Sequence, residues 1–222
     1  MPPTLVLIRH AQAIHNINRA NHALRDPSLT DLGHRQSAEL REHLRAHFPA
    51  DRKVQLIVTS PMRRALQTAL VALDWLVNSG VPVLYPKPCD TGTSAAQLAT
   101  EFPAIDFSAL DPVYPDKTSA ASAAYRYKKG AVLARGQSAL ADLYERAEDV
   151  VIVVSHSGFL RTAVAGRWFA NADYRVFDFV SREGKDEEEP YRLVEWDLTR
   201  GKGGMGRSEE GVVEFGEGLP GL

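Results

Sequence analysis

Arginine and histidine side chains stand at three points of the sequence where a short apolar run ends. Arg9 and His10 follow one such run, Arg63 and Arg64 follow a second, and His156 follows a third. A guanidinium group offers a planar fork of donors that matches the oxygens of a phosphate. An imidazole held among such cations stays neutral and can attack phosphorus as a nucleophile. The three points together favour phosphoryl chemistry.

The apolar runs that carry these residues are typical of strands, and helical stretches separate them. The predicted strands are Thr4 to Ile8, Gln55 to Thr59, Val81 to Tyr85, Val150 to Ser155, Val176 to Val180 and Tyr191 to Leu198. This alternation predicts an α/β protein, a three-layer α/β/α sandwich around a mainly parallel six-stranded sheet. In such a sheet the carboxyl ends of the strands and the first turns of the following helices share one edge, where ligands bind. We therefore expect the three points to meet there.

Helix boundaries are marked by capping residues and by proline and glycine. Thr30 is typical of an N-cap, and Pro49 ends the helix that follows it. Ser60 is the predicted cap of a second helix, with Pro61 in its first position. A third helix is predicted over residues 121–148.

One domain over residues 1–199 accounts for most of the 222-residue chain. Residues 87 to about 125 hold several prolines and few apolar runs, which is typical of a lid-like excursion. Residues 200–222 are rich in glycine, and we expect a loose C-terminal tail.

Composition argues against several classes of partner. The formal net charge of -2 gives no overall basic field for nucleic acid, and no apolar run approaches the roughly 20 residues of a membrane span. The N-terminus has no signal-peptide pattern, and the single cysteine, Cys89, excludes an internal disulfide. His10 and His15 lack the spacing of a metal motif. We expect a cytoplasmic protein with no metal or other cofactor, no nucleic-acid partner and no membrane partner.

Four sequence blocks occur together and in a fixed order. They are Arg9-His10 with Asn16, "DPSLTDLGHRQS" over 26–37, "SPMRRALQTA" over 60–69 and "VVSHSG" over 153–158. In this combination the chain resembles the histidine phosphatase superfamily, in its phosphoglycerate mutase-like branch 1. The segment Pro88 to Gly92 resembles a stretch found in fungal members, which indicates a fungal-type protein.

The resemblance implies a role for each matching residue. His10 would accept the phosphoryl group from a small phosphate ester. The residues implied around the phosphate are Arg9, Arg64, His156, Asn16 and Ser157. Of the arginine pair, Arg64 would face the phosphate and Arg63 would face outward. The family's proton donor is usually a glutamate soon after the third strand. Here no glutamate stands between Val81 and Thr100, and Asp90 is the candidate acid.

Four functions fit these residues. The first is a phosphatase that hydrolyses a small organic phosphomonoester through a phosphohistidine on His10. The second is a lyase or hydrolase that uses the basic pocket for an anionic metabolite, because such a reaction would not need the missing glutamate. A phosphoglycerate mutase-like phosphotransferase and a non-catalytic phosphate-binding module are the others.

Overall fold

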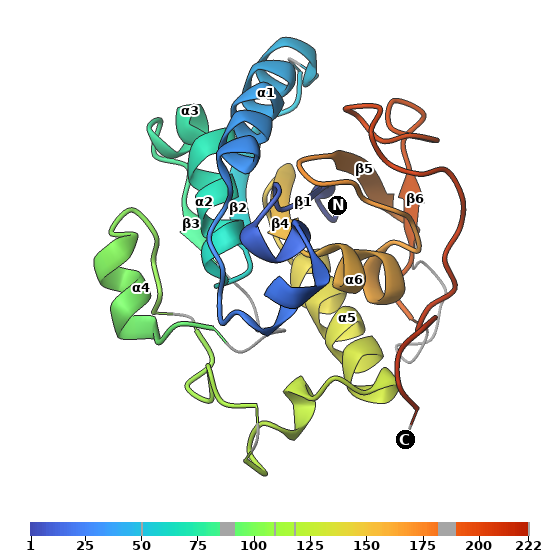
Figure 1. Ribbon diagram of the computed structural model, residues 1–222. Helices are drawn as coiled ribbons and strands as arrows, with labels where there is room; N and C mark the ends of the chain where they lie inside the picture. Colours follow the sequence, from blue (N-terminus) through green and yellow to red (C-terminus); the bar gives the residue numbers. More distant parts are fainter. Residues whose placement is uncertain (50, 85–91, 109, 118, 182–189, 222) are drawn as a thin grey trace.

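The computed structural model has a six-stranded sheet between two layers of helices (Figure 1). It describes residues 1–49, 51–84, 92–108, 110–117, 119–181 and 190–221. The strands are β1 (Thr4–Arg9), β2 (Val54–Thr59), β3 (Val83–Leu84), β4 (Val150–Ser155), β5 (Tyr174–Phe179) and β6 (Leu193–Glu195). Their order is β3-β2-β4-β1-β5-β6; β1 to β4 are parallel to one another, and β5 pairs antiparallel with both β1 and β6. The predicted sandwich with a mainly parallel sheet is confirmed.

Helices cover both faces of the sheet. On one side lie α1 (Asp31–His47), α2 (Arg63–Ala72) and α3 (Asp74–Val77), and on the other α5 (Lys129–Tyr144), α6 (Ser157–Phe159) and the π-helical turn η4 (Leu160–Val164). A further helix, α4 (Ala95–Glu101), and three short turns complete the elements: η1 (Ile14–Asn16), η2 (Arg19–Ala23) and η3 (Ala123–Tyr125). Because alternate β1 side chains face opposite layers, Val6 packs in one apolar core and Leu7 in the other.

The two predicted helix caps have different outcomes. The Thr30 side chain accepts a hydrogen bond from the backbone N–H of Gly33 at 3.0 Å, so this N-cap is confirmed. The predicted Ser60 cap is wrong, since α2 begins at Arg63 after a Met62 N-cap that makes no side-chain bond. The carboxylate of Asp26 accepts the Arg63 backbone N–H instead, at 2.8 Å. A residue distant in sequence thus takes the place of a local cap.

The predicted helix over residues 121–148 is shorter in the structure. Its first part forms η3, and α5 begins only at Lys129. Arg135 of α5 turns back and donates from Nη1 to the carbonyl oxygens of Ala124 and Arg126 at 2.5 and 3.3 Å. These carbonyl groups therefore bond to a side chain, where a continuous helix would have used them for backbone bonds.

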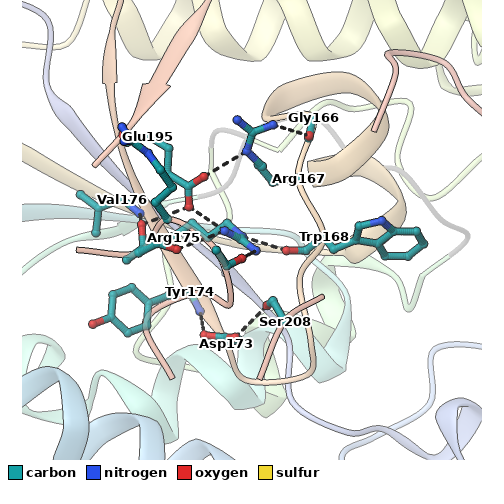
Figure 2. Close-up of polar contacts among 12 residues, drawn as sticks. Gly166, Arg167, Trp168, Asp173, Tyr174, Arg175, Val176, Glu195 and Ser208 are labelled. Carbon is teal, nitrogen blue, oxygen red and sulfur yellow. Dashed lines mark hydrogen bonds and ion pairs between the residues drawn. The ribbon is translucent and has the colours of Figure 1, made fainter. Parts of the chain in front are cut away.

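The glycine-rich C-terminal segment is packed, so the expectation of a loose tail is wrong. Figure 2 shows how Asp173 and Arg175 hold it. The carboxylate of Asp173 accepts hydrogen bonds from the backbone N–H groups of Met205 and Arg207 and from the hydroxyl of Ser208, at 2.7 to 3.1 Å. Arg175, fully buried, donates to the carbonyl of Gly201 at 2.7 Å. Tertiary bonds supply the order that the glycine content does not predict.

Candidate active site

The register between β1 and β4 brings two of the predicted site residues together. Arg9 pairs with Ser155 across the two parallel strands, so the residues that follow, His10 and His156, leave the sheet side by side. The His10 backbone N–H donates to the Ser155 carbonyl at 2.9 Å, and the two imidazole ring centres are 5.2 Å apart. Arg64 reaches the same place from the first turn of α2.

A cavity of about 280 Å³ opens at this edge of the sheet. Five of the predicted site residues line it: Arg9, His10, Arg64, His156 and Ser157. Its outer wall includes Tyr127, Val132 and the C-terminal residues 217–219. The residues that follow β1 and β4 therefore line one cavity, as the sequence predicts.

His10 is held as a neutral imidazole with one nitrogen committed to the backbone. Its side chain is 3% exposed, and Nδ1 lies 2.7 Å from the Ala11 carbonyl oxygen. A carbonyl oxygen only accepts, so Nδ1 carries the proton and Nε2 keeps its lone pair. Burial, the neighbouring His156 and the cations Arg64 and Arg9 keep the His10 pKa well below 6.5. The free nitrogen can therefore act as a nucleophile at neutral pH.

His156 connects Arg64 to Ser60. Arg64 donates from Nη2 to His156 Nδ1 at 3.2 Å, and His156 Nε2 lies 2.8 Å from the Ser60 hydroxyl. Because the guanidinium can only donate, Nδ1 is the acceptor and Nε2 carries the proton. Burial and the Arg64 charge hold the His156 pKa well below 6.5. Ser60, predicted as a helix cap, instead orients this histidine.

Arg9 is a second cation of the cavity. It donates from Nη1 to the Phe169 carbonyl oxygen at 2.9 Å, while its Nε is buried without a hydrogen-bond partner in the described part of the chain. Burial, then the charges of Arg161 and Arg64, lower the Arg9 pKa to about 10. Cations this close repel one another, so a bound anion would stabilise the arrangement.

Arg161 also lines this cavity, and the sequence reasoning missed it. Its guanidinium carbon lies 4.1 Å from the ring centre of Trp168. Within the described ranges it forms no ion pair with a carboxylate, and its Nε has no hydrogen-bond partner. The available signal was its position in "HSGFLR", one to two helical turns after His156. Arg161 therefore adds positive charge that no carboxylate in the described ranges pairs with.

Three other predicted residues lie differently. Asn16 is absent from the cavity lining; its Oδ1 accepts from the Ala13 backbone N–H at 3.1 Å and caps η1. Arg63 faces outward, as predicted, and pairs with Glu101 at 2.8 Å. Asp90, the candidate acid, lies outside the described residues.

Close packing of α1 fixes the loop that follows His10. The backbone N–H of Gln12 donates to Gln36 Oε1 at 2.9 Å. A Cβ at Gly33 would overlap the carbonyl oxygen of Gln12, so only glycine allows this approach. The loop on the other side of the site contributes as well, because Asn171 Nδ2 donates to the His10 carbonyl at 2.9 Å.

The described residues form neither a cluster of metal ligands nor a membrane-spanning helix. Among the side chains placed in the structure, no group of three His, Cys, Asp or Glu residues could hold a metal ion. No helix in the described ranges is long and apolar enough to cross a membrane.

Comparison with known proteins places the chain in a family. The model of the histidine phosphatase superfamily (branch 1) matches residues 5–79. A phosphoglycerate mutase-like protein of Arabidopsis thaliana is 31% identical over 198 residues, covering 71% of this chain and 72% of the relative. The chain belongs to the histidine phosphatase superfamily. A candidate phosphatase of Schizosaccharomyces pombe is 30% identical over 172 residues. The match covers 71% of this chain and 76% of the S. pombe protein.

Solved structures of other proteins share the fold. A candidate alpha-ribazole-5'-P phosphatase from Escherichia coli aligns with a TM-score of 0.55 at 16% identity, covering 88% of this chain and 95% of that one. A mycobacterial glucosyl-3-phosphoglycerate phosphatase aligns with a TM-score of 0.50 at 19% identity, covering 89% and 99%. At these identities the likeness concerns the fold alone. The assignment to a fungal-type member stays a prediction.

Proposed function

We propose that this histidine phosphatase family member hydrolyses a small organic phosphomonoester through a phosphohistidine on His10. The observation that carries the proposal is the state of His10, whose Nδ1 is bonded to the Ala11 carbonyl while burial and nearby cations keep the ring neutral. Membership of the family and the names of the phosphatase relatives support the same reaction class.

The reaction has two steps. In the first, Nε2 of His10 attacks phosphorus in line, and the bond from phosphorus to the leaving oxygen breaks. In the second, water attacks the phosphohistidine, and the electron pair of the P–N bond returns to Nε2. Arg9, Arg64 and Arg161 line the cavity around this position and would stabilise the charge on the equatorial oxygens.

The size of the cavity supports a small substrate. At about 280 Å³ it is near the lower end of the volumes that hold small-molecule ligands. Apolar and aromatic side chains, Val132 and Tyr127, stand beside the arginines and would contact the alcohol portion of the ester.

The test is turnover of p-nitrophenyl phosphate with rapid-quench detection of the intermediate. We expect release of nitrophenol and an acid-labile phosphate on the protein, both lost in His10→Ala. His34→Ala is the matched control, because His34 is exposed on α1 and should leave both unchanged. Phosphate binding without transfer or release would contradict the proposal and support a binding module.

A further inference from the structure

The C-terminal segment supplies one wall of the cavity that contains His10. In Figure 1 the chain runs back past α5 to its end, and the Lys129 backbone N–H donates to the Pro220 carbonyl at 2.9 Å. Glu217, Gly218 and Leu219 line the cavity there. Residues at the two ends of the sequence thus face the same space.

Glu217 is the only carboxylate among the described residues that line this cavity. The other charged or titratable side chains there are Arg9, Arg64, Arg135, Arg161, His10, His15, His156 and Tyr127. A carboxylate weakens the binding of an anion by like-charge repulsion. Glu217 therefore does not help to bind the anion, and a role in proton transfer would account for its place in the cavity.

Hydrogen bonds fix the backbone on both sides of Glu217. Gly216 donates its N–H to the Thr162 carbonyl of η4 at 2.8 Å, and Val213 donates to the Gly166 carbonyl at 3.0 Å. Gly216 has a φ of +77°, a conformation that favours glycine, and a Cβ there would overlap the Lys129 side chain. The turn that presents Glu217 is thus tied to the turn that follows His156.

The Glu217 side chain is oriented by its own turn. Its Oε2 accepts a hydrogen bond from the Glu214 backbone N–H at 3.2 Å. This bond uses one carboxyl oxygen and leaves Oε1 for a ligand. Glu217 is exposed, so water and substrate can exchange protons with it.

We infer that Glu217 is the general acid and base of the phosphatase reaction, which makes this inference dependent on the proposed function. An alkoxide is a poor leaving group, so hydrolysis of an alkyl phosphate needs a proton donor at the leaving oxygen. Among the described residues that line the cavity, Glu217 supplies the one carboxyl group for that role.

The proton transfers balance over the two steps. As Nε2 of His10 bonds to phosphorus, the P–O electron pair moves to the leaving oxygen, which takes the proton of the Glu217 carboxyl group and departs as the alcohol. The Glu217 carboxylate then takes a proton from the attacking water, and the P–N electron pair returns to Nε2. Inorganic phosphate leaves and Glu217 is protonated again.

The experiment compares two esters that differ in their need for an acid. Glu217→Gln is mixed rapidly with p-nitrophenyl phosphate, whose leaving group is a stable anion, and with glycerol 2-phosphate, whose leaving group is not. The readout is the first-turnover rate of alcohol release, which isolates the first step. We expect a loss of about 10²- to 10⁴-fold for glycerol 2-phosphate and less than about threefold for p-nitrophenyl phosphate.

Two further variants give the controls. Glu214→Gln removes an exposed carboxylate of the same turn that does not line the cavity, and we expect both first-turnover rates to stay unchanged. Asp90→Asn tests the acid predicted from sequence. A selective loss in Asp90→Asn, with none in Glu217→Gln, would overturn the inference and move the role to Asp90.

The remaining outcomes also decide the question. Equal changes for both esters in Glu217→Gln would overturn the inference, because a group that only repels the anion affects both alike. Failure of the proposed function is separate: it would appear as no p-nitrophenyl phosphate turnover and no phosphohistidine in the unmodified protein.

Discussion

At the scale of single residues, the protonation states of two histidines set what the cavity can do. Neutral His10 and His156 line a cavity that also contains four arginines. Each has a ring nitrogen whose role follows from its partner, the Ala11 carbonyl or the Arg64 guanidinium. Their lowered pKa values result mainly from burial, so the packing around the site also keeps His10, the proposed nucleophile, unprotonated.

This coupling predicts that the protein loses stability as the pH falls below 6.5. In the unfolded chain both histidines take up protons near pH 6.5, whereas in the folded protein they resist protonation, so acid favours unfolding. Each histidine lowers the free energy of unfolding by up to about 1.4 kcal/mol for each pH unit of acidification. Urea unfolding between pH 7 and pH 5.5 in phosphate-free buffer measures the slope. We expect His10→Asn to reduce this dependence of the free energy of unfolding on pH. An unchanged dependence would contradict the lowered pKa of His10.

Arg161 gives a second prediction at this scale, concerning anion affinity. Arg161→Ala should raise the inhibition constant of vanadate about 10- to 100-fold, because a charge-assisted hydrogen bond to the anion is lost. Trp168→Leu should raise it less, since the guanidinium keeps its charge and loses only the aromatic face. Arg146→Ala is the control, because Arg146 pairs with Glu148 and does not line the cavity. Equal inhibition in Arg161→Ala and the unmodified protein would exclude Arg161 from anion binding.

At the scale of elements, the close approach of α5 to η4 positions the helical side of the site. Gly136 makes this approach possible: a Cβ there would overlap the carbonyl oxygen of Ala163. η4 in turn carries Arg161, whose guanidinium stacks on Trp168. Gly136 of α5 therefore allows η4 to lie where Arg161 can reach Trp168.

The two glycines of α5 therefore predict opposite effects on stability. Gly136→Ala should lower the free energy of unfolding by about 1–3 kcal/mol, because the added methyl group forces α5 and η4 apart. Gly130→Ala meets no atom within 4 Å, so helix propensity should dominate and raise stability by up to about 1 kcal/mol. Thermal unfolding of both variants checks this. Similar effects of the two substitutions would argue against the close approach.

At the scale of the whole molecule, a buried ionic network joins the sheet to the C-terminal segment. Arg175 on β5 pairs with Glu195 on β6 at 2.7 Å, and its Nε donates to the Trp168 carbonyl at 2.8 Å (Figure 2). Arg167 also reaches Glu195, at 3.1 Å. The loop that supports Arg9 and Arg161 is therefore bonded to the same network as residues 199–209.

Removing one member of this network should destabilise the entire fold. Glu195→Leu leaves the buried Arg175 charge without its carboxylate and should cost about 3–5 kcal/mol in the free energy of unfolding, measured in urea. The double variant Arg175→Met with Glu195→Leu should recover part of that loss, since the uncompensated charge is gone. Glu210→Leu, at an exposed position, should have little effect. A loss below about 1 kcal/mol in Glu195→Leu would show that the network contributes little.

Features that depend on neighbouring residues were predictable from the order of residues. An unbroken apolar run predicted β1, and the polar residues directly after β1 and β4 predicted His10 and His156 at one edge of the sheet. The Thr30 cap was also predictable, because a cap is set within one turn. The outward-facing Arg63 was implied by the resemblance to the family.

The distant groups that complete these local features are brought in by the folding of the whole chain. Asp26 caps α2, Trp168 supports Arg161, and Glu217 faces the cavity from the far end of the chain. None of these contacts has a signal in sequence spacing, because the strand register and the packing of the C-terminal segment against Asp173 and Arg175 create them. Caps, strands and the residues that end them thus follow from the order of residues. Contacts between side chains distant in sequence depend on which surfaces the folded chain buries against each other.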